Sequence, residues 1–188
     1  PHIRDVTRRL ALEGFLAFGA DFLTPAGGTP ADDEKAREMI GALKPEDILA
    51  TAQGAVKALA AHPQANGKVG AVGFCWGGGV VNALAVADPA LAAGVAYYGR
   101  QAPATQVPQI KAPLLLHYGG LDERINAGIA EFETALKANS KTYEIYVYDG
   151  ANHAFNNDTN AARYNKDAAD LAWGRTVAFL KKHAGGVA

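Results

Sequence analysis

The sequence predicts an α/β fold in which helices cover both faces of a mostly parallel sheet. Short apolar segments alternate with segments of helical length along most of the chain, which is typical of parallel sheets. The 188 residues are 49% hydrophobic and 20% charged, enough for one core without disulfides or a structural metal. We therefore expect a single domain over residues 1–188.

The first part of the chain predicts one helix and one strand. Ile3, Val6 and Leu10 recur at near-helical spacing, and Gly14 supplies a natural helix end. Residues 15–23 follow as a nearly continuous apolar run that is too short for a second helix. We therefore expect a buried strand there.

Two more helices are expected before the alternation becomes regular. The acidic residues 32–34 follow Pro30 and suit the positive end of a helix dipole. A further helix starts near Pro45 and ends before Pro63. Ile48, Val56 and Leu59 are expected to point inward from this second helix.

The remaining chain alternates strands and helices. The expected strands are residues 68–74, 93–98, 113–118 and 143–148, and the expected helices are residues 76–87, 129–138 and 161–183. In such sheets ligands bind beyond the carboxyl ends of the strands. The loops after the strands are therefore where a site is expected.

Cys75 lies where an apolar strand turns into a helix, in the segment Gly-Phe-Cys-Trp-Gly-Gly-Gly of residues 73–79. This is the context of a nucleophile elbow, in which glycines allow a sharp, strained turn. The following helix is expected to favour the thiolate through its dipole. The alternative is that Cys75 is a buried small hydrophobic residue. The only serine is Ser140, outside such a turn, so a serine hydrolase is excluded.

A thiol nucleophile needs a base and a carboxylate that orients it. His153 follows the last strand and Asp122 follows the strand before it, which gives the order Cys, Asp, His known from α/β-hydrolases. Asp149 and Glu123 are alternative carboxylates. The other histidines have structural explanations at helix ends, in a strand or at the chain start: His2, His62, His117 and His183. We therefore predict a Cys75, Asp122, His153 triad.

At these residues the sequence resembles the dienelactone hydrolase family, the carboxymethylenebutenolidases. The matching segments are residues 1–6, 73–78, 96–99 and 150–155, and the Gly-x-Asp that ends at Asp122. The resemblance implies a three-layer α/β-hydrolase fold, no cofactor and no metal. It also implies hydrolysis of small carboxylic esters or lactones through a thioester on Cys75, with the backbone N–H of Trp76 in the oxyanion hole.

The resemblance also implies an N-terminally truncated fold. Family members carry three strands and a first oxyanion loop before the helix with which this sequence opens. One of those strands lies between the strands expected at residues 15–23 and 68–74. We therefore expect one of two arrangements: the first strand shifts to pair with the second, or another copy of the chain completes the edge as a homodimer.

Substrate recognition is harder to assign. Family members hold a substrate carboxylate with arginines, and Arg100 and Arg124 are candidates beside the expected strand ends. Tyr98, Phe155 and Trp76 are candidates for an apolar wall. The alternatives are solvated arginines and aromatic core packing.

Charge and composition limit the partners. The net charge is −1 without a basic cluster, which gives no reason to expect nucleic acid or an anionic membrane. No apolar run approaches the roughly 20 residues that span a bilayer, so we expect a cytoplasmic protein. Two other functions stay open: a weak or inactive domain that self-associates, and a cysteine amidase of glutaminase type. The amidase is disfavoured because residue 155 is Phe rather than a carboxylate.

Overall fold

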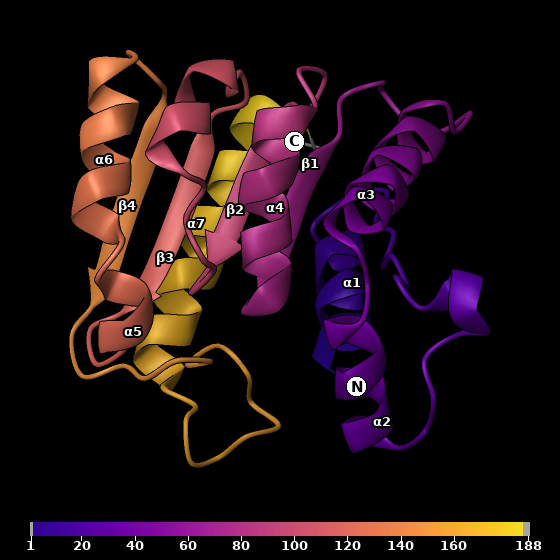
Figure 1. The fold of residues 1–188 in the computed structure, drawn as a ribbon, viewed down its shortest axis with the longest axis horizontal. Coiled ribbons are helices and arrows are strands. Elements are labelled where there is room, and N and C mark those ends of the chain that lie inside the picture. The colour runs from indigo at the N-terminus through magenta and orange to yellow at the C-terminus, as the bar shows by residue number, and fades with distance from the viewer. Residues whose placement is uncertain (1, 186–188) are drawn as a thin grey trace.

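The computed structural model describes residues 2–185, so Pro1 and residues 186–188 lie outside the description that follows. Four strands alternate with helices in chain order (Figure 1). The strands are β1 (Gly70–Phe74), β2 (Ala93–Tyr97), β3 (Leu114–Gly119) and β4 (Tyr143–Tyr148). The helices are α1 (His2–Leu12), α2 (Asp33–Gly41), α3 (Pro45–Ala60), α4 (Trp76–Ala87), α5 (Glu123–Asn126), α6 (Ile129–Ala138) and α7 (Lys166–His183), with short 3-10 turns η1 (Thr24–Ala26) and η2 (Ala104–Gln109).

The sheet is parallel throughout, in the order β1-β2-β3-β4. Figure 1 shows α4 in front of the sheet and α7 behind it, while α1, α2 and α3 lie beyond β1, on the side away from β4. The α/β fold class predicted from the alternation is therefore confirmed. All four strands end at the same edge, which is the geometry that brings the following loops together.

Strand alternation divides the core into two layers. Leu114 and Leu116 pack on the face covered by α3, α4 and α6, whereas Leu115 packs on the face covered by α1 and α7. All three side chains are fully buried. Successive residues of a strand point to opposite faces, so one continuous apolar run fills both layers.

The expected strand at residues 15–23 is wrong. The segment forms no strand, and Phe18 is 63% exposed, although Leu23 is buried. A groove of about 670 Å³ separates it from β1, and its walls come from the segment, α1, α3 and β1. Because a strand needs a hydrogen-bonded neighbour, the segment stays irregular. The expectation that residues 15–23 shift to pair with β1 is also wrong, because the groove lies between them. Strand β1 is therefore an edge of the described sheet.

The boundaries of the expected helices agree with the sequence except at α7, and the short helix α5 was not expected. Gly14 ends the first helix with φ of 90°, and the Asp32 side chain caps α2 by accepting from the Lys35 N–H. Helix α7 begins at Lys166 rather than at residue 161, because the Asn165 side chain caps it and residues 161–165 belong to the preceding loop.

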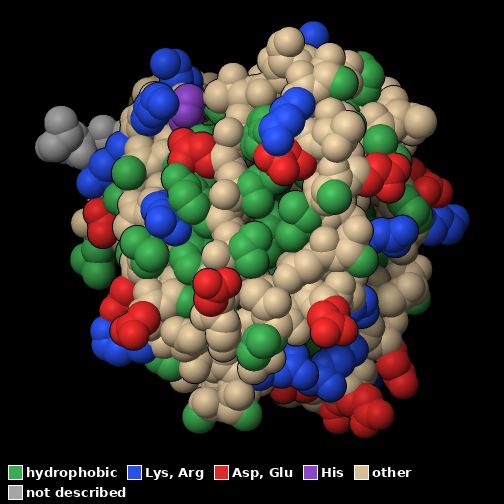
Figure 2. Space-filling model, turned by 90° about the vertical axis from the view of Figure 1, so that its left-hand side faces the viewer, with side chains coloured by type: hydrophobic (Ala, Val, Ile, Leu, Met, Phe, Trp, Pro, Cys, Tyr) green, Lys and Arg blue, Asp and Glu red, His purple; other side chains and the backbone are tan. Residues whose placement is uncertain are grey.

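The opposite edge of the sheet is β4. Figure 2 shows this side of the molecule, where hydrophobic side chains gather in the middle and charged side chains of both signs surround them. Val147, on β4, is 49% exposed. Within residues 2–185, no helix has the length and apolar character needed to cross a membrane.

Candidate active site

Cys75 occupies a sharp turn between β1 and α4. Its φ of 53° and ψ of −117° lie in a backbone region that residues other than glycine rarely adopt. The Cys75 N–H donates to the carbonyl oxygen of Tyr97 at 3.1 Å, and its own carbonyl accepts from the Gly79 N–H at 3.2 Å. The backbone is thus held in the strained conformation that the sequence motif predicts.

Glycines make this turn possible. A Cβ atom on Gly73 would lie 2.1 Å from the carbonyl oxygen of Gly77. A Cβ atom on Gly78 would lie 2.8 Å from the carbonyl oxygen of Tyr97 and 2.9 Å from the Cα of Gly99. These neighbours are backbone atoms that cannot move aside, so both positions require glycine.

His153 and Asp122 meet at the carboxyl ends of β4 and β3. The Nδ1 atom of His153 lies 2.5 Å from Oδ2 of Asp122, and the other carboxylate oxygen accepts a longer bond from the Ile125 N–H at 3.4 Å. Asp122 is buried and the His153 side chain is 21% exposed. Because the carboxylate accepts from Nδ1–H, the neutral imidazole has its lone pair on Nε2. That nitrogen is the one that can act as a base.

The loops that carry these two residues are fastened to each other. The Leu121 N–H donates to the carbonyl oxygen of Ala151 at 3.0 Å, and the Gly120 N–H donates to that of Tyr148 at 2.8 Å. A Cβ atom on Gly119 would lie 2.7 Å from the Ala151 carbonyl oxygen. The close approach of the two loops therefore depends on a glycine at the end of β3.

Tyr98 lies beneath the site at the end of β2. Its φ is 39°, its ring centroid is 5.0 Å from that of His153, and its side chain is 1% exposed. Burial raises the pKa of its phenol, and the backbone N–H of Asn156 lowers it by hydrogen bonding. Phe155 is also fully buried, with its ring 5.3 Å from Tyr98. Both aromatic residues pack under the loop of His153, so a substrate contact by either stays a prediction.

Burial raises the pKa of the Cys75 thiol to about 11. The guanidinium groups of Arg163 and Arg124 act in the opposite direction, and the Asp122 carboxylate raises the pKa further. The expectation that the start of α4 would favour the thiolate is therefore wrong for this conformation: desolvation outweighs the favourable charges, and the neutral thiol is the resting form.

The remaining predicted residues differ in exposure. Trp76 is 40% exposed, and its indole packs edge-on against Phe22 with the ring centroids 5.2 Å apart. Its backbone N–H is the first of α4, where helical N–H groups have no acceptor within the helix. Arg100 and Arg124 are exposed. Arg163, the first arginine after His153 and a further candidate for holding a substrate carboxylate, is also exposed, and its charge acts on Cys75.

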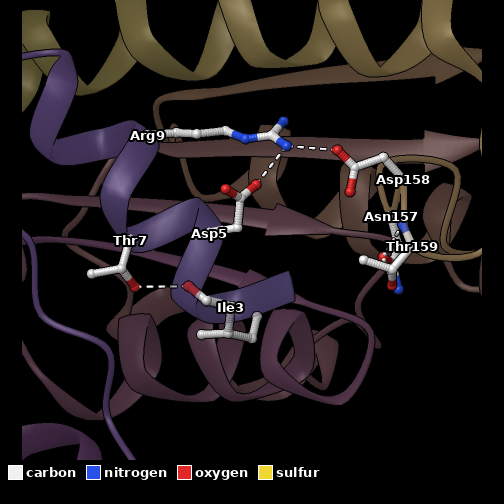
Figure 3. A network of polar contacts seen from close by, with 7 residues as sticks. All are labelled: Ile3, Asp5, Thr7, Arg9, Asn157, Asp158 and Thr159. Carbon is white, nitrogen blue, oxygen red and sulfur yellow. Dashed lines mark hydrogen bonds and ion pairs between the residues drawn. The ribbon is translucent and has the colours of Figure 1, made fainter. Parts of the chain in front are cut away.

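A polar contact between α1 and the loop after His153 was not predicted from the sequence. Nη2 of Arg9 lies 2.6 Å from Oδ2 of Asp158 and 2.5 Å from Oδ2 of Asp5 (Figure 3). Arg9 and Asp158 are 149 residues apart in the chain, so no local pattern could reveal the contact. The described residues contain no cluster of three or more His, Cys, Asp or Glu side chains suited to a metal ion.

Comparisons with known proteins agree with this architecture. The profile of the Dienelactone hydrolase family matches residues 1–184. A protein of Escherichia coli O157:H7, provisionally named carboxymethylenebutenolidase, is 32% identical over 98% of this chain and 73% of its own length. A Bradyrhizobium protein, provisionally named a 2-oxo-3-(5-oxofuran-2-ylidene)propanoate lactonase, is 32% identical over 97% of this chain and 78% of its own length.

The fold comparison gives the same result. A crystal structure from Klebsiella pneumoniae subsp. pneumoniae MGH 78578, of a protein provisionally named dienelactone hydrolase, matches with a TM-score of 0.86 and 31% identity. The match covers 97% of this chain and 81% of that chain. This chain therefore belongs to the dienelactone hydrolase family and has its α/β-hydrolase fold.

Proposed function

We propose that this hydrolase cleaves small carboxylic esters or lactones through a Cys75, His153, Asp122 triad. The observation that carries the proposal is the 2.5 Å contact of His153 Nδ1 with Asp122, on the same sheet edge as a cysteine in a strained turn. A dienelactone hydrolase-like hydrolase follows from the family, whereas the roles of these residues are our proposal.

In the first half-reaction, Nε2 of His153 takes the proton from the Cys75 thiol as the sulfur attacks the ester carbonyl carbon. The carbonyl oxygen becomes an oxyanion that the Trp76 N–H stabilises. The tetrahedral intermediate then expels the alkoxide, which receives the proton held on His153. The products are the alcohol and a thioester on Cys75. When the substrate is a lactone, the alcohol and the thioester remain parts of one molecule.

In the second half-reaction, His153 takes a proton from water, and the resulting hydroxide attacks the thioester carbonyl. Collapse of the second tetrahedral intermediate breaks the carbon–sulfur bond, releases the carboxylic acid and returns the proton to the sulfur. Because the raised thiol pKa leaves little free thiolate at neutral pH, proton transfer to His153 accompanies the attack.

The charges near Cys75 favour substrates that carry an anionic group. Arg163 and Arg124 are exposed and their charges reach the thiol. A carboxylate on the substrate would accept hydrogen bonds from such guanidinium groups. The name of the Bradyrhizobium relative, which describes a lactone bearing a propanoate, supports the same class. Arg100 is also exposed, but it is not among the charges that act on the Cys75 thiol, so its substitution serves as the control for that of Arg124.

The test is hydrolysis of short p-nitrophenyl esters and of small lactones by the wild type, Cys75→Ala and His153→Ala. We expect both variants to lose turnover by at least about 10³-fold. Equal rates for wild type and Cys75→Ala would contradict the proposal. For the anionic substrate class, Arg124→Gln should raise KM for a lactone that carries a carboxylate and leave KM for a neutral ester unchanged, with Arg100→Gln as the control.

A further inference from the structure

A row of aromatic side chains crosses the sheet on the face covered by α7. Tyr97 of β2 is in register with His117 of β3, which is in register with Tyr146 of β4. The ring centroids of Tyr97 and His117 are 4.4 Å apart. Tyr148, two residues after Tyr146, faces the same side because side chains alternate along a strand. Thr176 of α7 meets this row and is fully buried.

Hydrogen bonds link these side chains into one network. Nη1 of Arg175 donates to the Tyr148 hydroxyl at 3.1 Å, and arginine cannot accept. The Tyr148 hydroxyl in turn lies 2.9 Å from Nδ1 of His117, and Nε2 of His117 lies 3.1 Å from Oγ1 of Thr176. With Tyr148 donating to Nδ1, neutral His117 donates from Nε2 to Thr176. Oγ1 of Thr176 is also 2.6 Å from the Tyr97 hydroxyl.

The surroundings keep His117 in its neutral form. Burial, and then the charge of Arg175, lower the pKa of His117 to about 3. Arg175 stacks over the ring of Tyr146, with its guanidinium carbon 3.7 Å from the ring centroid. The phenol groups of Tyr97, Tyr146 and Tyr148 have raised pKa values and stay neutral. At neutral pH the network therefore contains a neutral histidine and neutral phenols.

The backbone carbonyls of three network members, Tyr97, His117 and Tyr148, hold parts of the candidate active site. The carbonyl of Tyr97 accepts from the Cys75 N–H, and that of His117 accepts from the Tyr98 N–H at 2.6 Å. The carbonyl of Tyr148 accepts from the Gly120 N–H, in the loop that leads to Asp122. Tyr148 is also the last residue of β4, directly before the loop of His153. The network thus lies behind the ends of β3 and β4, which present Asp122 and His153, and reaches Cys75 through the carbonyl of Tyr97 on β2.

We propose that Thr176 is a positioning residue for this site: its hydroxyl joins His117 to Tyr97 and so fixes the ends of β2, β3 and β4 relative to one another. This role rests on the function proposed above. A valine would fill the same space, so packing alone does not require a hydroxyl at this buried position. Its removal would leave Nε2 of His117 and the hydroxyl of Tyr97 without their shared partner inside the protein, which favours displacement of both.

The test compares Thr176→Val with Thr176→Ser and with Val177→Ala. Thr176→Val keeps the shape and removes the hydroxyl, whereas Thr176→Ser keeps the hydroxyl. Val177, the next residue of α7, is buried and outside the network, so its truncation controls for general destabilisation of the helix. Esterase kcat and KM, the melting temperature, and the downfield proton resonance of His153 Nδ1–H would be measured for each.

We expect Thr176→Val to lower kcat by about 10- to 100-fold with KM nearly unchanged, since small displacements of reacting groups have costs of this size. The Nδ1–H resonance of His153 should shift or broaden in this variant. Thr176→Ser should restore both properties, and Val177→Ala should lower the melting temperature without changing either. If Thr176→Val does not fold, Tyr97→Phe serves as the second test, because it removes the hydrogen bond between Thr176 and Tyr97 from the tyrosine side. Wild-type kcat and a wild-type His153 resonance in both single variants, Thr176→Ser and Tyr97→Phe, would then overturn the role.

The outcomes separate this role from the proposed function. If the wild type hydrolyses esters through Cys75 but Thr176→Val folds and keeps its kcat and the His153 resonance, the positioning role is wrong. If no variant affects hydrolysis because the wild type lacks Cys75-dependent activity, the proposed function fails. In that case the His153 resonance still reports on Thr176: a change confined to Thr176→Val supports the positioning role, and no change overturns it.

Discussion

Arg9 on α1 donates a 2.6 Å hydrogen bond to Asp158, in the loop between β4 and α7 that also contains His153. The contact joins the first described helix to the loop that carries the candidate base, although neither end belongs to the triad. Both side chains are partly exposed, so the bond is expected to be modest in energy.

We expect this bond to contribute about 0.2–1 kcal/mol of coupling in a double-mutant cycle of Arg9→Gln and Asp158→Asn. Arg9 lowers the pKa of Asp158, so the contribution is present above the ordinary aspartate pKa and is lost as pH falls through the folded value. Denaturant unfolding at pH 7 and at about pH 3 measures it. A coupling that grows as pH falls would contradict this assignment.

Asp122→Asn is expected to leave the fold intact and to lower kcat by about 10³–10⁴-fold. An amide can donate to Nδ1 of His153 and so favours the tautomer in which Nε2 carries the proton and cannot act as a base. Steady-state kinetics with a p-nitrophenyl ester would show the loss. Asp149→Asn is the matched control, since Asp149 follows β4 and makes no side-chain bond to His153 in the described structure. An equal loss in both variants would argue against Asp122.

Alkylation of Cys75 by iodoacetamide should rise about tenfold per pH unit and level off near pH 11, because the thiolate is the reacting form and burial raises the thiol pKa. The unfolded chain should level off near pH 8.5. Folding stability should accordingly fall above about pH 8.5. Arg163→Gln should slow the reaction at each pH, since Arg163 lowers this pKa. A plateau below pH 8.5 in the folded protein would refute the burial argument.

Gly73→Ala is expected to prevent stable folding, because its Cβ atom would lie 2.1 Å from the backbone oxygen of Gly77. Gly77→Ala is the matched control. Nothing lies within 4 Å of a Cβ atom there, and alanine is favoured over glycine within a helix by about 1 kcal/mol. Thermal unfolding should therefore show a loss for the first variant and an unchanged or higher midpoint for the second. Equal midpoints would show that the turn can relax.

The open groove beside β1 leads us to expect self-association through this edge. Unpaired strand edges and apolar surfaces promote association. Phe18 lies on the groove wall and is 63% exposed, so a charged residue at this position should oppose association. Sedimentation should show a dimer for the wild type and weaker association for Phe18→Glu. Leu171→Glu, on the exposed side of α7, should behave as the wild type. A monomer at every concentration would contradict the expectation.

The second half of the fold could be predicted because its elements are determined locally. The apolar runs at 113–118 and 143–148 and the glycines beside Cys75 specify strands and a turn without reference to distant residues. The segment at residues 15–23 could not be predicted, since an apolar run becomes a strand only where a neighbour can pair with it. The direction of the Cys75 pKa shift was also out of reach, because burial depends on the assembled structure.

The site shows the same division. Asp122 and His153 were recognisable from their places after two strands, whereas Arg9, Asp158 and Thr176 take part through contacts between elements far apart in the chain. No spacing rule connects such residues. Sequence patterns therefore identified the groups proposed to react, and the structure identified contacts between distant elements around them.

The parallel order of the four strands also bears on how the protein folds. Each strand pairs with the next only after a crossover segment has been closed, and such non-local pairings form slowly. Asp122 and His153 come together only when β3 has joined β4. A chain that has formed its helices but not this pairing would contain every residue of the site and no site. Catalytic competence should therefore not appear before β3 and β4 have paired.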